Sequence, residues 1–143
     1  MGTILVTYGN AAYDHEGYAG RVLRDGTVSS RWSAETDALA TGELAPACSC
    51  GWIGTGRWQI PGDDPTAWSS GDLDDQVTAV WQSEHAVPVL TAAAGKAWAR
   101  LAYELRCLAD QVDDGWPAER VATALDAIRA SVAALPSKAP TGG

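Results

Sequence analysis

The chain has 143 residues and a formal net charge of −8 at pH 7, with 46% hydrophobic and 20% charged residues. This length suits one domain with a real core, and the composition is that of a globular protein rather than a disordered one. The acidic balance argues against direct binding to nucleic acid, because phosphate contacts depend on clusters of basic residues.

The sequence has neither a predicted membrane span nor a predicted signal peptide. No apolar run approaches the length of a membrane span, and residues 1–6 are too short to form a signal peptide. We therefore expect a cytoplasmic protein without membrane contact. In that compartment its three cysteines are expected to be thiols or metal ligands rather than disulfides.

The beginning of the chain has the pattern of an antiparallel sheet. Residues 3–8 are β-branched and apolar, end at a glycine and predict a first strand. Residues 17–23 and 27–32 follow as a second and a third strand. They flank Asp25-Gly26, a dipeptide that supplies the positive φ of a two-residue hairpin turn.

A short helix and two more extended segments come next. Ser33 suits the N-cap of the helix, and Gly42 suits its C-terminal stop. Residues 43–47 are predicted to return as a strand. Residues 52–53 and 58–60 are candidates for a further hairpin.

Beyond a loop at residues 61–71, the apolar period changes from that of strands to that of helices. Asp72 is the predicted cap of a helix that ends at Pro88, because proline interrupts the helical hydrogen bonds. Apolar residues then recur every three or four positions from 90 to 112, and again from 121 to 135, around a Gly-Trp-Pro turn. This repeat predicts an antiparallel helical hairpin.

The clearest chemical signal is a pair of cysteines and two histidines. Cys48 and Cys50 stand one residue apart in a turn-forming Cys-Ser-Cys-Gly-Trp segment. His85 lies near the end of the first predicted long helix, and His15 is the only other histidine. Cysteine sulfur and histidine nitrogen are the ligands of structural zinc, which is bound tetrahedrally. The sequence therefore predicts a zinc site at Cys48, Cys50 and His85, with His15 as the candidate fourth ligand.

Each of these residues also has a simpler interpretation. Cys48 and Cys50 would serve equally as small buried thiols at a strand end, since common zinc turns separate their cysteines by two residues. His85 would suit a helix end, where a cation meets the negative end of the helix dipole. Cys107, in the predicted hairpin, is expected to be a small buried hydrophobe rather than a ligand.

The order of these motifs resembles a group of small uncharacterised actinobacterial proteins with a CxCGWxG … WxxEHxxP signature. The resemblance covers residues 13–88 and leaves the helical hairpin outside. It implies a shared structural metal site at Cys48, Cys50 and His85, and it implies no particular activity. Those proteins often carry a further histidine shortly after the glycine, where this chain has Ile60-Pro61. The residues that match the signature are Cys48, Cys50, Gly51, Trp52, Gly54, Trp81, Glu84, His85 and Pro88.

Together these patterns predict an α+β fold: a small antiparallel β-sheet with a zinc-knuckle-like turn, a docked helix and a C-terminal antiparallel helical hairpin. We expect residues 1–88 to form the β-rich, zinc-binding region with its helix. Residues 89–135 are expected to form the hairpin. Residues 136–143 have nothing to bury and are predicted to be a disordered tail.

The function that best suits this architecture is a zinc-stabilised binding or regulatory protein that acts through protein–protein contacts. One alternative comes from an acidic stretch without Lys or Arg between Arg57 and Lys96. This stretch would suit a basic partner, or an inhibitor that mimics nucleic-acid phosphates. Its charges are also explained by a solvated loop and by the N-terminus of a helix, where carboxylates are favourable.

The other alternative is a zinc-dependent hydrolase or deaminase, with three ligands, a water and Glu84 as base. Adjacent helical residues point about 100° apart, so Glu84 would not easily face a metal held by His85. The deaminase signature, a Gly-x-Ser-x-Gly elbow and a phosphate-binding loop are all missing. We therefore assign no catalytic residue and expect no enzyme.

The apolar stripes of residues 90–112 and 118–135 also predict a homodimer. Two hairpins would form a four-helix bundle across a two-fold axis. The competing arrangement packs the hairpin against the sheet of the same chain through Trp98 or Trp116.

Overall fold

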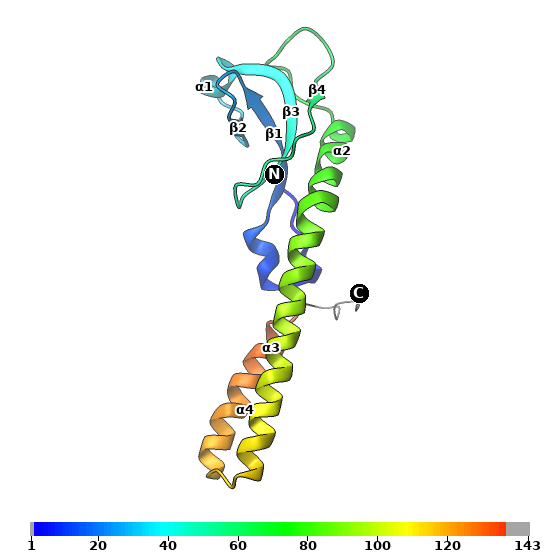
Figure 1. Cartoon of the computed structure of the whole chain (residues 1–143). Coiled ribbons are helices and arrows are strands. Elements are labelled where there is room, and N and C mark those ends of the chain that lie inside the picture. The colour runs from blue at the N-terminus through cyan, green and yellow to red at the C-terminus, as the bar shows by residue number, and fades with distance from the viewer. Residues whose placement is uncertain (1, 137–143) are drawn as a thin grey trace. The chain divides into compact units, whose positions relative to one another are not determined.

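The computed structural model describes residues 2–136 and confirms the α+β fold (Figure 1). The chain divides into two compact units: one contains Tyr13–Pro88 and the start of the chain up to Leu5, the other contains Val6–Ala12 and the chain from Val89 onward. Of the predicted tail, residues 137–143 lie outside the described residues. The elements are the 3-10 helices η1 (Val6–Tyr8) and η2 (Asn10–Asp14), β1 (Gly17–Leu23), β2 (Val28–Ser29), α1 (Ala34–Asp37), β3 (Ala40–Cys48), β4 (Trp58–Gln59), α2 (Gly71–Trp81), the π-helix η3 (Gln82–Ala86), α3 (Val87–Asp113) and α4 (Ala118–Ala133).

The first unit is built on a four-stranded antiparallel sheet with the strand order β2-β1-β3-β4. The central strands β1 and β3 pair from Gly17 opposite Cys48 to Leu23 opposite Ala40, with a shift of register between Arg21 and Leu23. This register places the start of β1 beside the end of β3. The segments that flank those two strand ends are therefore brought together.

Residues 3–8 do not form the predicted first strand. Only Thr3 joins the sheet: its N–H donates to the carbonyl of Gly17 (2.7 Å), and the N–H of Gly17 donates back (2.9 Å). The rest of the apolar run leaves the sheet because residues 6–12 belong to the second unit, where Ala12 is fully buried.

The hairpin of β1 and β2 is present, but its turn is longer than the predicted two residues. The N–H of Leu23 donates to the carbonyl of Thr27 (2.8 Å), and the N–H of Gly26 donates to the carbonyl of Leu23 (2.9 Å). Arg24, Asp25 and Gly26 therefore form the loop, with Gly26 at φ +87°. Hydrogen bonds from the hydroxyl and the N–H of Thr27 (2.6 and 3.0 Å) lower the pKa of Asp25.

Ser33 caps α1 as predicted. Its hydroxyl accepts from the N–H of Thr36 (3.4 Å), and the hydroxyl of Thr36 accepts from the N–H of Ser33 (3.0 Å), which makes a capping box. The predicted helix stop is wrong, because α1 ends at Asp37 and Gly42 lies inside β3 with φ +81°.

The predicted further hairpin is also wrong. Ile53 bridges to Ala47, and Trp58 of β4 pairs with Leu44, so both segments line the free edge of β3 instead of each other. A strand edge offers unpaired backbone groups, and β3 is long enough to satisfy both segments.

Helix α2 packs against the sheet and begins at Ser70 rather than at the predicted cap, Asp72. The Ser70 hydroxyl accepts from the N–H of Leu73 (3.2 Å), while Asp72 lies in the first turn. Trp81, near the end of α2, is fully buried and fits against Gly17, where an added Cβ would overlap the indole. The core of this unit consists of Leu44, Ile60 and Val77 with Ala19, Trp32, Trp58, Ala67 and Leu73 around them.

The helix does not end at Pro88. The π-helical turn η3 follows α2, and the N–H of Val87 donates to the carbonyl of Gln82, five residues earlier. Pro88 has no N–H, and its ring would crowd the carbonyl four residues earlier in a regular α-helix. The wider π-turn directly before Pro88 relieves this conflict, so the helical hydrogen bonds continue into α3.

In the second unit, α3 and α4 form the predicted antiparallel hairpin. Gly115, at φ +74°, follows α3, and Pro117 is the N-cap of α4 rather than part of its first turn. Leu101 and Ile128 are buried, and the Ser131 hydroxyl donates to the Glu104 carboxylate (2.9 Å). None of the helices within residues 2–136 combines the length and apolar character that a membrane span requires.

Candidate metal centre

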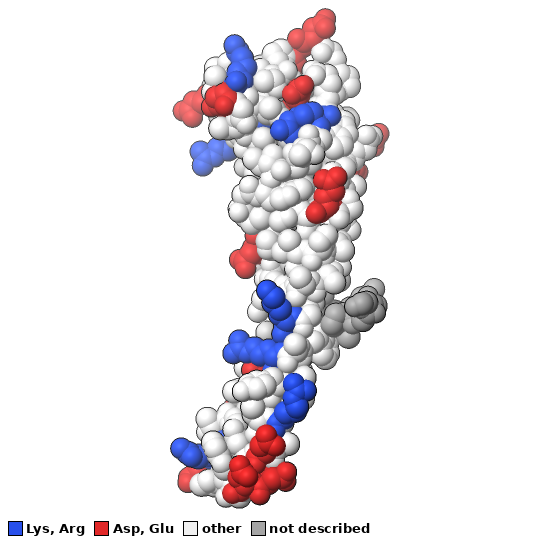
Figure 2. Space-filling model, viewed as in Figure 1, with Lys and Arg blue, Asp and Glu red and all other residues white. Residues whose placement is uncertain are grey.

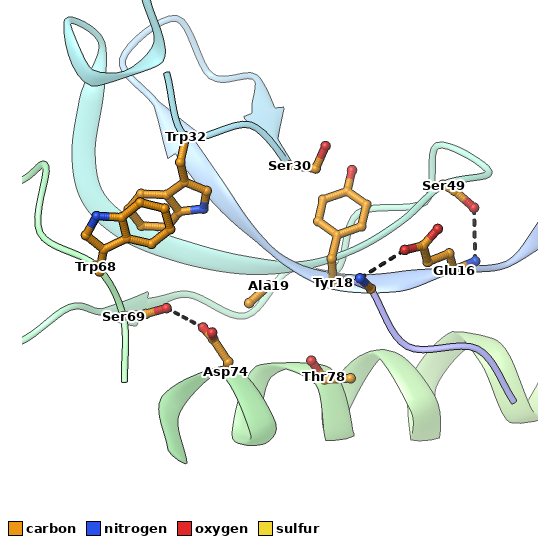
Figure 3. Close-up of a pocket in the computed structure, with 11 residues that line it drawn as sticks. Glu16, Tyr18, Ala19, Ser30, Trp32, Ser49, Trp68, Ser69, Asp74 and Thr78 are labelled. Atoms are coloured by element: carbon orange, nitrogen blue, oxygen red, sulfur yellow. Dashed lines mark hydrogen bonds between the residues drawn. The ribbon is translucent and has the colours of Figure 1, made fainter. Parts of the chain in front are cut away.

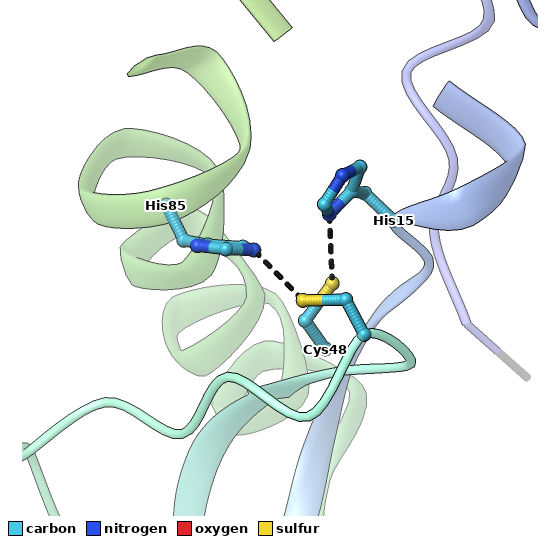
Figure 4. A group of neighbouring side chains, drawn as sticks. His15, Cys48 and His85 are labelled. Atoms are coloured by element: carbon cyan, nitrogen blue, oxygen red, sulfur yellow. Dashed lines mark hydrogen bonds between the residues drawn. The ribbon is translucent and has the colours of Figure 1, made fainter. Parts of the chain in front are cut away.

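The four predicted ligands come together in the first unit, and Figure 4 labels His15, Cys48 and His85. His15 follows η2, Cys48 is the last residue of β3, Cys50 lies in the next turn and His85 lies in η3. One ligand atom of each residue, an imidazole nitrogen or a thiol sulfur, lies within 4.8 Å of the other three. Three segments that are distant in sequence thus point their donor atoms at one place.

The cysteine turn is folded by its own backbone. The N–H of Gly51 donates to the carbonyl of Cys48 (3.0 Å), and the N–H of Cys48 donates to the carbonyl of Trp52 (2.9 Å). Gly51 has φ +101°, a conformation that residues with a side chain rarely adopt. This explains why a glycine directly follows Cys50.

Ser49 connects this turn to the segment that carries His15. Its hydroxyl accepts from the N–H of Glu16 (2.9 Å), and its own N–H donates to the carbonyl of Glu16 (2.8 Å). The same hydroxyl donates to the carbonyl of Asp14 (3.3 Å). These hydrogen bonds hold Asp14 and Glu16, the neighbours of His15, against Ser49, which lies between Cys48 and Cys50.

The distances between the donor atoms suit a tetrahedral metal ion. Sγ of Cys48 lies 3.7 Å from Nδ1 of His15, and Sγ of Cys50 lies 3.2 Å from Nε2 of His85. Zinc bonds of about 2.3 Å to sulfur and 2.0–2.1 Å to nitrogen place tetrahedral ligands roughly 3.3–3.8 Å apart. The two observed distances are close to this range, and all separations between the four donor atoms are within 4.8 Å.

The residues around His85 favour the neutral form of its imidazole and orient the ring. Burial, and then the nearby His15, lower the pKa of His85, which favours the neutral imidazole that a metal requires. Its ring stacks on the indole of Trp52. Partial desolvation of its sulfur raises the pKa of the Cys50 thiol although the residue as a whole is exposed, so a bound metal would displace a proton there. Cys48 is buried, whereas Cys50 is exposed at the surface.

Other residues considered from the sequence lie elsewhere. Cys107 is half-buried in α3 of the second unit, and Glu84 is exposed. The π-turn and the stack of Trp52 on His85 were not predicted from the sequence. Their only sequence signals are a tryptophan directly after Cys-Gly and a proline three residues after His85.

A cavity of about 600 Å³ lies in the same unit, and two of its lining residues belong to the segments that carry the candidate ligands (Figure 3). These are Ser49, between the two cysteines, and Glu16, next to His15. Trp32 and Trp68 also line it, with their rings stacked at 4.7 Å and inclined by 11°. The remaining lining residues are Gly2, Tyr18, Ala19, Ser30, Ser69, Asp74 and Thr78, so no Lys or Arg of the described residues lines the cavity.

Comparison of this chain with protein-family models, with curated proteins and with solved structures finds no match. Its function therefore has to be inferred from the chemistry of the metal centre and of the cavity beside it.

Proposed function

We propose that His15, Cys48, Cys50 and His85 bind one Zn²⁺ ion, and that the chain is a small binding protein whose fold this ion stabilises. The observation that carries the proposal is the approach of all four donor atoms to within 4.8 Å of one another. Two thiols and two imidazoles are a donor set that suits zinc, whereas calcium and magnesium prefer oxygen ligands.

The donor set supports a structural role rather than a hydrolytic one. Four protein ligands complete a tetrahedral shell, whereas catalytic zinc sites use three and keep the fourth position for water. Glu84, the candidate base of a hydrolase, is exposed. Glu84 and His85 are adjacent in η3, and adjacent residues of a helix project in different directions, which directs Glu84 away from the donor atom of His85.

A structural ion at this place would tie the sheet to the helix. The ligands come from the end of β3, from the segment before β1 and from η3, which follows α2. The unfolded chain holds no preformed site, so the binding free energy of zinc contributes to the stability of the fold. The ion would also hold Ser49 and Glu16 in the wall of the cavity.

The cavity suits a basic segment of a protein partner. Glu16 and Asp74 line it, where they accept hydrogen bonds from the N–H of Gly2 (2.9 Å) and the hydroxyl of Ser69. Arg21 already lies over the ring of Trp32 (4.1 Å), and the exposed indole of Trp68 offers a ring face to a further cation. Several of the other acidic residues have local roles as well, which weakens the case for mimicry of nucleic acid. Asp64, for example, accepts hydrogen bonds from the hydroxyl and the N–H of Thr66 (2.7 and 2.9 Å), which lower its pKa.

Metal analysis of the purified protein tests the proposal. We expect about one equivalent of zinc per chain and a lower melting temperature after removal of the ion by a chelator. Cys48→Ser should lose the zinc, and Cys107→Ser, the matched control in the other unit, should keep it. A protein that holds no zinc and melts at the same temperature with and without chelator would contradict the proposal.

A further inference from the structure

The second unit exposes four large aliphatic side chains on its two long helices. Leu105 and Val112 of α3 are 48% and 56% exposed, and Leu125 and Val132 of α4 are 36% and 51% exposed. Each pair is seven residues apart, which is close to two helical turns, so the members of a pair lie one above the other. The pattern is therefore an apolar stripe on each helix.

Both stripes lie on the same side of the hairpin. Leu101 and Glu104 of α3 face α4, and a rotation of 100° per residue places Leu105 and Val112 to one side of them. Ile128 and Ser131 of α4 face α3, and the same rotation per residue places Leu125 and Val132 on the side of the hairpin that carries Leu105 and Val112. We call Leu105, Val112, Leu125 and Val132 the apolar face.

The residues on the opposite side of the hairpin agree with this placement of the apolar face. A groove between the two helices is lined there by Tyr103 and Cys107 of α3 and by Ala124 and Ala127 of α4. The helical rotation that places the apolar face on one side places these four residues on the other. Tyr103 is 63% exposed, which makes it a matched control for Leu105 on the same helix.

Charge is unevenly distributed along the hairpin. Figure 2 shows basic side chains on the half away from the Gly-Trp-Pro turn and acidic side chains near that turn. The residues that run against this trend have partners of their own: Glu104 pairs with Arg100 (3.0 Å), Asp126 pairs with Arg129 (3.5 Å), and Arg120 stacks on Trp116 (4.9 Å). Each half keeps its sign when these opposing charges are counted. The half away from the turn contains Lys96, Arg100, Arg106 and Arg129 against Glu104 and Asp126, and the half next to it contains Asp110, Asp113, Asp114 and Glu119 against Arg120.

We propose that the apolar face binds the apolar face of a second copy of the chain, with the two hairpins antiparallel. In this arrangement the half of one hairpin next to its Gly-Trp-Pro turn lies against the half of the partner hairpin that is away from the turn. Association would cover both apolar faces in a four-helix bundle with a two-fold axis. The antiparallel orientation brings the basic half of each hairpin to the acidic half of the other. A parallel orientation would bring like charges together.

The charge and apolar patterns of the hairpin indicate that the partner at the apolar face is a second copy of the chain. The charge pattern is complementary to itself under a two-fold rotation, and both helices repeat their apolar residues every seven positions, the period of helix-to-helix packing. This proposal does not rest on the metal centre, because the face and the charges belong to the second unit.

Analytical ultracentrifugation over a range of concentrations tests the face. We expect a monomer–dimer equilibrium whose dissociation constant rises at least about tenfold in Leu105→Glu and stays unchanged in Tyr103→Glu. Circular dichroism is the control, and both variants should keep the helical signal of the wild type. A wild-type monomer at every concentration would overturn the proposal, and so would a dimer weakened only by Tyr103→Glu.

Charge reversal tests the orientation. Arg106→Glu with Arg129→Glu makes both halves acidic, and Asp113→Lys with Glu119→Lys makes both halves basic. Each double variant alone should dimerise at least about tenfold more weakly than the wild type, and an equimolar mixture should recover the dimer. Recovery in the mixture shows that both variants are folded. Variants that each dimerise like the wild type would overturn the antiparallel orientation.

Discussion

The indole of Trp52 lies flat against the imidazole of His85, with ring centroids 4.7 Å apart and planes inclined by 11°. Trp52 follows the cysteine turn, and His85 lies in the π-turn η3. The stack therefore joins two segments that both supply ligands, and it holds the ring with Nε2 3.2 Å from Sγ of Cys50. Loss of a neighbour that orients a ligand typically weakens metal binding by about 10–100-fold.

The first prediction concerns this stack. Trp52→Ala should raise the dissociation constant of zinc by about tenfold or more, because the imidazole loses the surface that orients it. Trp52→Phe should keep most of the affinity. Competition with a chromophoric chelator measures the change. Trp68→Ala is the control, since Trp68 stacks on another ring, that of Trp32, and should have no effect. Equal effects of the two alanine variants would show that the stack has no special role.

The second prediction concerns the two histidines. His15→Ala and His85→Ala should each lose zinc, because each removes one of four ligands from a closed tetrahedral shell. Cobalt replacement provides the measurement, since tetrahedral cobalt with two thiolates absorbs visible light strongly and each variant should lose that spectrum. Retention of the full spectrum in His15→Ala would show that His15 is not a ligand, and the hydrolytic alternative would then gain support.

The third prediction concerns the pH dependence of the metal-free protein. The fold lowers the pKa of His85, whereas the unfolded chain binds a proton at the ordinary pKa of about 6.5. Between these two pKa values the unfolded state holds more protons, so the free energy of unfolding increases with pH. This stabilisation is complete above the ordinary pKa and is lost as the pH falls through the lowered one. Urea unfolding of chelator-treated protein should show a lower midpoint at acidic pH than at neutral pH. The slope should be smaller in His85→Gln, and an unchanged slope would refute this origin.

The fourth prediction compares two glycines. Gly17→Ala should destabilise the protein by about 1–3 kcal/mol, because the added Cβ would overlap the buried indole of Trp81. Gly95→Ala, in the middle of α3, meets nothing within 4 Å and should stabilise the protein by about 0.5–1 kcal/mol. Thermal melting of the two variants measures the difference. Equal melting temperatures would mean that Gly17 and Trp81 are not packed as tightly as the structure shows.

Local chemistry explains the parts of the fold that could be predicted. Asp25-Gly26 places a turn after β1, Ser33 caps α1, and the apolar repeat over residues 90–112 and 121–135 produces the hairpin. Each of these signals acts between residues a few positions apart, so it can be recognised without knowledge of the rest of the chain.

Errors arose where residues distant in sequence compete for the same partners. Residues 3–8 have the composition of a strand, but only Thr3 pairs with β1. Pro88 should end a helix by local rules, and the π-turn before it lets the helix continue. Neither outcome is visible in a short window of sequence.

The sequence by itself determined the fold class and the identity of the four candidate ligands, because cysteine and histidine were too few to allow many other choices. Only the tertiary structure decided that these ligands meet. The register of β1 on β3 brings the His15 segment beside Cys48, and η3 turns His85 toward Cys50. Strand register and helix packing are set by burial summed over the whole unit, so no local pattern contains them.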